Sequence, residues 1–252
     1  MILAIIFLFG LCWGSFLNVL ATRILHHRKF FTKRSYCPSC KHTIAWQDNL
    51  PLLSFLLLRG QCRHCKAPIS WLYPATELVT GLLAVSLYAV TAEPLTYAAY
   101  ALFFTGLVAA TRTDLEAMLI PQLFSLGLIP LGLVAAWFGL IQISFLESIL
   151  GSLVGYGVLW LIAQLFLKIT KREGMGAGDY DLLAGIGAWI GPVGVWLTLM
   201  IASSVGTLLG IIYLYGTKQS RSLRIPFGPF LALGAIAYLF FHRTLLSLLM
   251  FP

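Results

Sequence analysis

The sequence predicts an all-α, polytopic membrane protein with about eight transmembrane helices, interrupted by one large polar loop. Hydrophobic residues make up 59% of the 252 residues and charged residues only 10%. The mean hydropathy is +0.88. The apolar residues fall into runs about as long as a helix that crosses a bilayer, which excludes an ordinary soluble domain.

The predicted helices follow these apolar runs. Residues 1–20 carry no basic residue at their start, so we expect a retained first transmembrane helix rather than a cleaved signal peptide. Further runs are 74–92, 96–111, 121–142, 145–167, 193–216 and 226–250, and the short segment 182–191 should pair with 193–216 through a Gly-Pro turn. The expected organisation is therefore a first helix (1–20), a loop (21–73) and a bundle of about seven helices (74–252).

Two pairs of glycines have the spacing that permits close helix packing in membranes. Gly151 and Gly155 form one pair, and Gly206 and Gly210 form the other. Such spacing is common by chance in a chain with 23 glycines and indicates nothing about function.

The basic residues predict the orientation. Nine of the 17 Lys and Arg residues lie between Arg23 and Lys66, and most of the others are in 168–172 and 218–224. If these connections are cytoplasmic, only Arg243 lies outside, in agreement with the positive-inside rule. An even number of helices then places both termini externally. The net charge of +8 is explained by this topology, and we expect membrane lipid but no nucleic acid as a partner.

Four of the five cysteines lie in the loop, as Cys37-Pro-Ser-Cys40 and Cys62-Arg-His-Cys65. Two such pairs at this separation are typical of a tetrahedral four-thiolate zinc site. A closed site of this kind has no position for water, so the zinc is expected to be structural. Disulfides and free thiols are alternatives, but a cytoplasmic loop disfavours disulfides.

Two histidines lie beside the cysteine pairs. His64 is inside the second pair and is a possible substitute ligand, and His42 is close to the first. Since four cysteines suffice, we expect both histidines to be solvated.

Two aspartates are the strongest candidates for chemistry. Asp114 and Asp179 each lie where a long apolar segment meets a short polar connection, in a chain with only nine acidic residues. Acidic groups near hydrocarbon are costly and often functional. Two carboxylates that meet can share one proton and activate water, as in aspartic proteases. Gly176 and Gly178 precede Asp179 and would let a substrate backbone or another helix come close.

Each aspartate also has a simpler interpretation. Thr113-Asp114-Leu115-Glu116 has the pattern of a capping box at a helix start, and Asp179 is suitable as a helix cap. Glu116 and Asp181 are rival acids two positions away. The predicted topology places both candidates on the cytoplasmic side, which favours their acting together.

The ordered motifs resemble those of the type IV prepilin peptidases, which are membrane aspartic proteases of the GxGD type. The resemblance covers nearly the whole chain. Its motifs are Gly14-Ser-Phe-Leu-Asn-Val19, the two cysteine pairs with Trp46, Asn49, Pro51 and Ser54 between them, Pro68-Ile-Ser, Tyr73-Pro74, Glu77-Leu78, Asp114-Leu-Glu, Gly176-Ala-Gly-Asp179 and Pro226-Phe-Gly-Pro-Phe-Leu-Ala-Leu-Gly234.

The resemblance implies an endopeptidase of the bacterial inner membrane with Asp114 and Asp179 as catalytic residues. Its substrates would be prepilins or pseudopilins, cut after a glycine at the cytoplasmic membrane face. Many relatives then methylate the new N-terminus with S-adenosylmethionine, so this activity and this methyl donor are expected by resemblance alone. The residues that bind the donor are unknown, since no glycine fingerprint for a nucleotide is present.

Two positions depart from the family pattern. Gln122 stands where an Asp is frequent, and Asp181 stands where a Lys is frequent. Both leave the aspartate pair intact, so they bear on substrate preference rather than on reaction type. The alternative function is a non-enzymatic assembly scaffold whose zinc loop docks a partner. An intramembrane metalloprotease is disfavoured because no HExxH motif is present, and a transporter would place its acids near mid-membrane.

Overall fold

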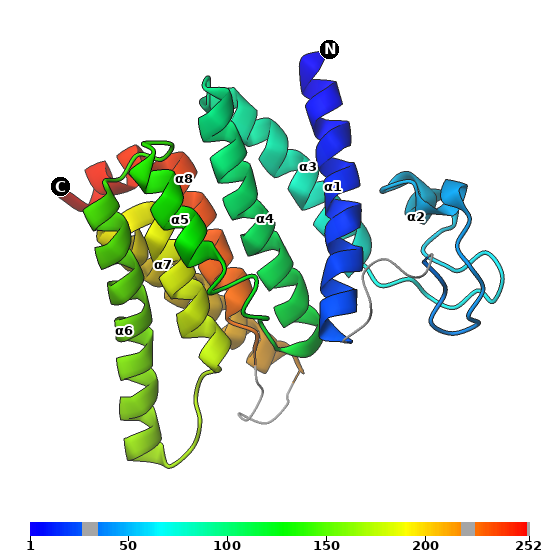
Figure 1. Ribbon diagram of the computed structural model, residues 1–252. Coiled ribbons are helices and arrows are strands. Elements are labelled where there is room, and N and C mark those ends of the chain that lie inside the picture. Colours follow the sequence, from blue (N-terminus) through cyan, green and yellow to red (C-terminus); the bar gives the residue numbers. More distant parts are fainter. Residues whose placement is uncertain (27–34, 218–224, 251–252) are drawn as a thin grey trace. The chain divides into compact units, whose positions relative to one another are not determined.

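A computed structural model describes residues 1–26, 35–217 and 225–250, and the regular structure in these ranges is helical (Figure 1). The elements are α1 Ile2–Leu25, the 3₁₀ helix η1 Trp46–Asn49, α2 Leu53–Leu57, α3 Leu72–Val90, α4 Pro94–Ala117, α5 Leu128–Trp137, α6 Phe145–Thr170, α7 Ala177–Thr217 and α8 Gly228–Met250. Five of them, namely α1, α3, α4, α6 and α7, are long and apolar enough to cross a membrane. The predicted all-α, polytopic fold is confirmed.

The chain forms two compact units, Met1–Arg112 and Thr113–Pro252. The first contains α1, the cysteine loop, α3 and most of α4. The second contains the last residues of α4 and the helices α5 to α8. The second unit begins at Thr113, so both candidate aspartates belong to it.

In the first unit, α1 packs closely against α3 because glycines line the contact. A Cβ atom built on Gly10 would lie 2.8 Å from the Cα of Gly81, and one on Gly14 would lie 2.7 Å from the Cα of Glu77. Neither position has room for a side chain. Small residues are the usual means by which membrane helices come this close.

A buried asparagine joins three segments of the first unit. The Asn18 side chain donates to the Tyr73 carbonyl at 3.0 Å and accepts from Nε of Arg112 at 2.9 Å. The Arg112 guanidinium also lies over the Tyr73 ring, 5.1 Å from its centroid. These contacts offset the cost of burying Arg112, because its Nε–H group donates to Asn18 and its positive charge lies over an aromatic ring.

The second unit is held together by close packing of α6 on α7. A Cβ atom on Gly151 would meet the backbone of Gly187, with the carbonyl carbon at 2.9 Å, and one on Gly155 would lie 2.8 Å from the carbonyl carbon of Leu183. The hydroxyl of Ser148 donates to the Ala188 carbonyl at 2.6 Å in the same interface. The Gly151–Gly155 spacing thus does allow the close helix approach that it suggested.

Gly191 divides α7 into two helical halves. Its φ of 71° and ψ of 179° are not helical, and Pro192 follows it. A Cβ atom on Gly187 would lie 2.9 Å from Cγ2 of Val195, whereas eight residues of a straight helix rise about 12 Å. The halves therefore bend sharply and pack against each other, as expected for the segments 182–191 and 193–216. Counting them separately gives the predicted number of about eight larger helices.

The helix expected over 121–142 is shorter in the structure. It covers only Leu128–Trp137, because residues 121–127 form turns in which the Gly127 amide donates to the Gln122 carbonyl at 2.9 Å. At the other end, Gly139 has a φ of 65° and terminates the helix. The indole of Trp189 donates to the Leu128 carbonyl at 2.9 Å and fixes the start of α5 on α7.

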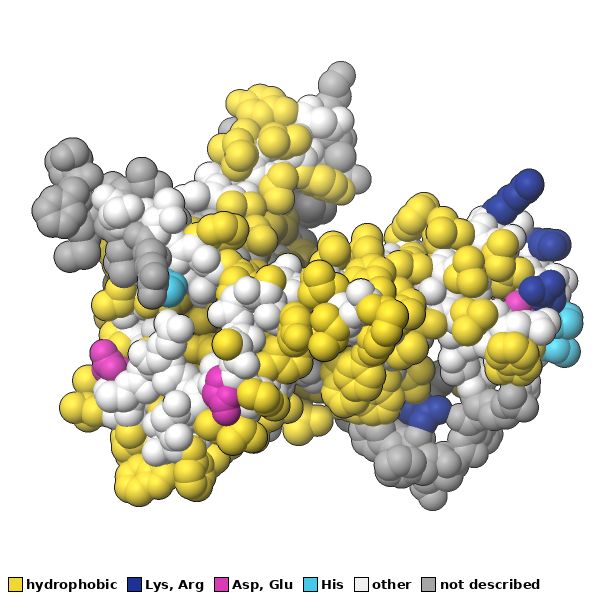
Figure 2. Space-filling model, turned by 90° about the horizontal axis from the view of Figure 1, so that it is seen from above, with side chains coloured by type: hydrophobic (Ala, Val, Ile, Leu, Met, Phe, Trp, Pro, Cys, Tyr) yellow, Lys and Arg dark blue, Asp and Glu magenta, His cyan; other side chains and the backbone are white. Residues whose placement is uncertain are grey.

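Hydrophobic side chains remain exposed along the long helices. In α6 the exposed residues include Leu146, Leu153, Leu161 and Ile169. Figure 2 shows that such side chains cover most of the visible face, while most of the visible Lys, Arg and His side chains gather in one part of it. An apolar exterior of this extent is unusual for a soluble protein and suits a multi-pass membrane protein.

Candidate functional site

The four loop cysteines form one cluster. The sulfur atoms of Cys37, Cys40, Cys62 and Cys65 all lie within 4.8 Å of one another, and none is in a disulfide. The sulfurs of Cys37 and Cys65 are 3.8 Å apart. Zinc–sulfur bonds of about 2.3 Å in a tetrahedron place the sulfurs about 3.8 Å apart. The donor set and its spacing therefore fit a zinc ion.

The cluster consists of two halves with the same backbone pattern. In the first, the Cys37 amide donates to the His42 carbonyl at 2.9 Å, and the Lys41 amide donates back to the Cys37 carbonyl. In the second, the Cys62 amide donates to the Ala67 carbonyl at 2.8 Å, and the Lys66 amide donates to the Cys62 carbonyl. Lys41 and Lys66 both have a φ of 60°.

This repetition is visible in the sequence as Cys-x-x-Cys-Lys-x-x-Ile-x-Trp, which occurs twice. It ends at Trp46 in the first half and at Trp71 in the second. Both tryptophans are strongly exposed, at 72% and 73%. The spacing of the two cysteine pairs predicted that the four cysteines form one cluster, but it did not reveal this wider repeat. A comparison of the residues that follow each pair detects the repeat.

The loop favours thiolates at two of the four positions. The amide of Cys40 lowers the pKa of the Cys37 thiol to about 6, against the opposing effect of burial. The amide of Cys65 likewise lowers the pKa of Cys62. At Cys65 the Ala67 amide favours the thiolate, but burial and the three neighbouring thiols outweigh it and raise the pKa to about 11. Four crowded sulfurs without a cation repel as thiolates, and a divalent cation removes that repulsion.

The two histidines stack on each other outside the sulfur cluster. The ring centroids of His42 and His64 are 3.5 Å apart, and both residues are exposed. Neither belongs to the group of four ligand atoms. Both rings therefore lie at the surface, outside the group of four sulfurs.

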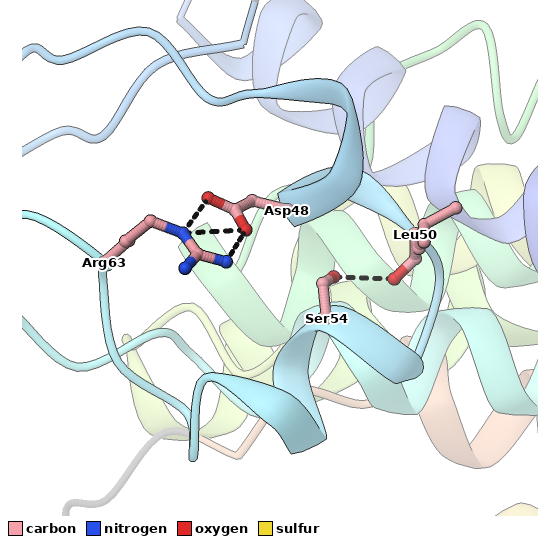
Figure 3. Close-up of polar contacts among 4 residues, drawn as sticks. All are labelled: Asp48, Leu50, Ser54 and Arg63. Carbon is pink, nitrogen blue, oxygen red and sulfur yellow. Dashed lines mark hydrogen bonds and ion pairs between the residues drawn. The ribbon is translucent and has the colours of Figure 1, made fainter.

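Polar contacts hold the loop between the cysteine pairs in place. The Arg63 guanidinium binds the Asp48 carboxylate through two nitrogens, and the Ser54 hydroxyl donates to the Leu50 carbonyl at 2.6 Å (Figure 3). The Arg63 guanidinium lowers the pKa of Asp48. The amide of Leu52 donates to the Glu77 carboxylate at 2.8 Å, which ties the loop to the start of α3.

Asp114 lies in the last turn of α4, where it is only 5% exposed. Its Oδ2 accepts a hydrogen bond of 2.9 Å from the amide of Gly228, the first residue of α8. The alternative interpretation as part of a capping box at a helix start is wrong, because α4 runs through residues 113–116. A carboxylate at the C-terminal end of a helix is electrostatically unfavourable, so its presence there needs another explanation.

Asp179 lies in the first turn of α7 and is half-buried. The carboxylates of Asp114 and Asp179 are close enough for their charges to interact. Ile120 packs against both Gly178, next to Asp179, and Gly228, whose amide binds Asp114. A Cβ atom on Gly178 would lie 2.9 Å from the Cβ of Ile120, and one on Gly228 would lie 3.0 Å from its Cδ1. The structure thus brings the two predicted aspartates together within the second unit.

The glycines before Asp179 differ from each other. Gly178 is needed for the contact with Ile120, whereas Gly176 is exposed, and a Cβ atom there would meet only Oδ2 of Asp179, at 3.7 Å. Of the rival acids, Glu116 is exposed and Asp181 is half-buried. Gln122 is exposed in the turn that precedes α5.

Comparisons with known proteins agree with this arrangement. Residues 8–91 match the family model for the bacterial peptidase A24 N-terminal domain, and residues 101–211 match the model for the type IV leader peptidase family. A prepilin leader peptidase/N-methyltransferase from Aeromonas hydrophila is 40% identical over 94% of this chain and 90% of its own length. The chain belongs to the type IV leader peptidase family.

Other members of the type IV leader peptidase family are similar over comparable lengths. The prepilin leader peptidase/N-methyltransferase of Stutzerimonas stutzeri is 38% identical over 96% of this chain and 92% of its own length. The type 4 prepilin-like proteins leader peptide-processing enzyme of Escherichia coli O78:H11 is 33% identical over 92% of this chain and 91% of its own length. No solved structure matches the chain.

Proposed function

We propose that this protein is an aspartic endopeptidase of the bacterial inner membrane that removes the leader peptide of prepilins or pseudopilins after a glycine, and then methylates the new N-terminus. The observation that carries this proposal is the meeting of Asp114 and Asp179, from two helices, at the ends of apolar segments. The names of the similar proteins from Aeromonas and Stutzerimonas support the same substrate class and both activities.

In the proposed mechanism the two aspartates hold one proton between them. The ionised carboxylate takes a proton from a water molecule as its oxygen attacks the carbonyl carbon of the scissile bond. The protonated carboxyl donates a hydrogen bond to the carbonyl oxygen as negative charge develops there. When the tetrahedral intermediate collapses, the carbon–nitrogen bond breaks and a proton passes from the pair to the leaving amine.

The glycines before Asp179 have separate roles in this proposal. Gly176 is exposed beside the Asp179 carboxylate, which lets an extended substrate backbone lie against the pair. Gly178 allows the start of α7 to pack against Ile120 and so keeps Asp179 near Asp114.

The cysteine cluster has a structural role in the same proposal. Cys37, Cys40, Cys62 and Cys65 would hold a zinc ion by four sulfurs, and such an ion would supply no activated water. S-adenosylmethionine is the methyl donor by resemblance. The loop is cytoplasmic and both termini are external, because this orientation places the basic connections inside.

The proposal is tested by incubating the purified protein in lipid nanodiscs with a candidate prepilin and S-adenosylmethionine and measuring intact masses. We expect loss of the leader and a gain of one methyl group. Asp114→Asn and Asp179→Asn should each lower the cleavage rate at least about 10³-fold while the protein stays folded, since an amide does not act as the base. The controls Glu116→Gln and Asp181→Asn should retain most activity. Near-normal cleavage by folded Asp179→Asn protein would end the aspartic-protease proposal, and absence of cleavage by the folded wild-type protein would favour an assembly scaffold.

A further inference from the structure

The first turn of α8 has one backbone donor whose partner comes from a different helix. The first N–H groups of an α-helix lack acceptors within the helix. In α8, Pro229 has no N–H, and the amide of Phe230 donates to the Phe227 carbonyl at 3.0 Å. The Gly228 amide donates to Oδ2 of Asp114. Asp114 therefore caps α8 from a position 114 residues away in the sequence.

Position 228 has no room for a side chain next to that carboxylate. A Cβ atom built on Gly228 would lie 2.8 Å from Oδ2 of Asp114 and 3.0 Å from Cδ1 of Ile120. Gly228 does not have a positive φ, so backbone conformation does not require glycine here. The requirement comes from the Asp114 carboxylate, which any larger residue would push away from the amide.

The hydrogen bond distinguishes the two aspartates electrostatically. Asp179 lies in the first turn of α7 and Asp114 faces the first turn of α8, so both experience the positive end of a helix dipole. Two close carboxylates do not readily ionise together. The Asp179 carboxylate also has a backbone donor, in Gly176, but that residue is exposed to water. Gly228 and Asp114 are both buried, where a hydrogen bond to a charged group is stronger. The buried contact favours negative charge on Asp114.

We propose that Gly228 is a positioning residue whose amide holds Asp114 as the ionised member of the pair. Asp114 is then the group that takes the proton from water, and Asp179 carries the proton that is donated to the substrate carbonyl. This inference rests on the proposed endopeptidase function and deepens it, because it assigns different roles to the two aspartates and gives the Pro-Phe-Gly-Pro motif a task.

The test compares Gly228→Ala with Gly234→Ala in nanodiscs. Gly234 lies on the same helix, and a Cβ atom there would meet the Thr198 carbonyl oxygen at 2.6 Å, with no aspartate among its neighbours. Both variants disturb the packing of α8, but only Gly228→Ala displaces Asp114. The readouts are kcat, KM and the dependence of kcat/KM on pH for leader cleavage.

We expect Gly228→Ala to lower kcat at least about tenfold with little change in KM, and to move the acidic limb of the kcat/KM profile upward by about one pH unit. The sign follows because a carboxylate that loses its donor needs a higher pH to ionise. Besides the pair itself, the titratable groups next to it in the chain are Arg112 and Glu116 on α4 and Tyr180 and Asp181 on α7. The charge of Asp179 acts on Tyr180, and residues 228–240 of α8 contain no charged side chain. Gly234→Ala should keep the wild-type limb. Identical limbs in the two variants would overturn the proposal.

A second comparison does not require the Gly228 variant to fold. In the wild-type background, Asp179→Asn retains a group that donates to the carbonyl oxygen, whereas Asp114→Asn lacks the base. We therefore expect the residual cleavage rate of Asp179→Asn to exceed that of Asp114→Asn at least about tenfold. An equal or reversed order contradicts the assigned roles while leaving the endopeptidase function intact. Near-normal cleavage by both variants would instead contradict the aspartic mechanism, and absence of cleavage by the folded wild-type protein would contradict the endopeptidase function.

Discussion

Two glycines on α6 should respond in opposite directions to the same substitution. A Cβ atom on Gly151 would meet the backbone of Gly187 and lie 2.8 Å from the Cα of Gly191. A Cβ atom on Gly157 would have no heavy atom within 4 Å apart from its chain neighbours and the nearby backbone of α6. Replacing glycine by alanine within a helix gains about 1 kcal/mol of helix propensity at either position. Comparing the stabilities of the two alanine variants therefore distinguishes the effect of helix propensity from the effect of packing.

The size of each effect follows from these contacts. Gly157→Ala should stabilise the protein by about 0.5–1 kcal/mol, because nothing opposes the gain in propensity. Gly151→Ala forces α6 away from α7, and overpacking of this kind typically costs about 1–3 kcal/mol or more. The two variants should thus differ by about 2 kcal/mol, which corresponds to roughly 4–8 °C in Tm for a chain of this length.

The assay is thermal unfolding of the purified variants in one detergent, together with leader cleavage. Since Gly187 is on the same half of α7 as Asp179, Gly151→Ala should also lower cleavage, and Gly157→Ala should leave it unchanged. Equal stability of the two variants would refute the close contact between α6 and α7. A destabilised Gly157→Ala protein would contradict the open surroundings of that residue.

Two further predictions concern the loop. Of the described loop residues 35–71 only Cys37 is buried, so the loop has no apolar core of its own, and structural zinc in small domains contributes about 10–16 kcal/mol. We expect about one zinc per chain. Cys37→Ser or chelation of the metal should abolish hydrogen-exchange protection in 35–71 while α6 stays protected. Full protection of 35–71 in metal-free protein would disprove the structural role of the metal. The loop should be cytoplasmic and both termini external. Thiol labelling at Cys40 and a reporter fused after Pro252 will test this orientation in intact cells. Labelling of Cys40 from outside the cells would show that the predicted orientation is wrong.

The sequence predicted those features that depend on residues near one another in the chain. Apolar runs located the long helices, and the spacing of the cysteine pairs indicated the ligand set of the cluster. The extent of α5 was overestimated, because the turn over 121–127 is apolar and hydropathy does not distinguish an apolar turn from helix. The two-half structure of α7 was anticipated only because Gly191 and Pro192 mark it directly.

Features that depend on distant contacts were not predictable in this way. The capping interpretation of Asp114 assumed that a helix starts at Thr113, whereas α4 continues through this residue and ends at Ala117. A short pattern of polar residues does not reveal whether the helix precedes or follows it. The bond from Gly228 to Asp114 joins residues that no local pattern relates. Glycine at 228 looks like an ordinary component of a Pro-rich helix start until the carboxylate beside it is seen.

The duplicated arrangement of the cysteine loop has a consequence for biosynthesis. Each half contributes two sulfurs, so the half that ends at Trp46 cannot complete a tetrahedral site while the ribosome is still making the second. During that interval α1 has already been made, and the first half of the cluster remains open. Closure becomes possible only after Cys65, shortly before α3 begins at Leu72. If the cluster holds zinc, the ion can therefore bind before the next helix has been made, and a nascent chain arrested between the two halves should bind zinc weakly.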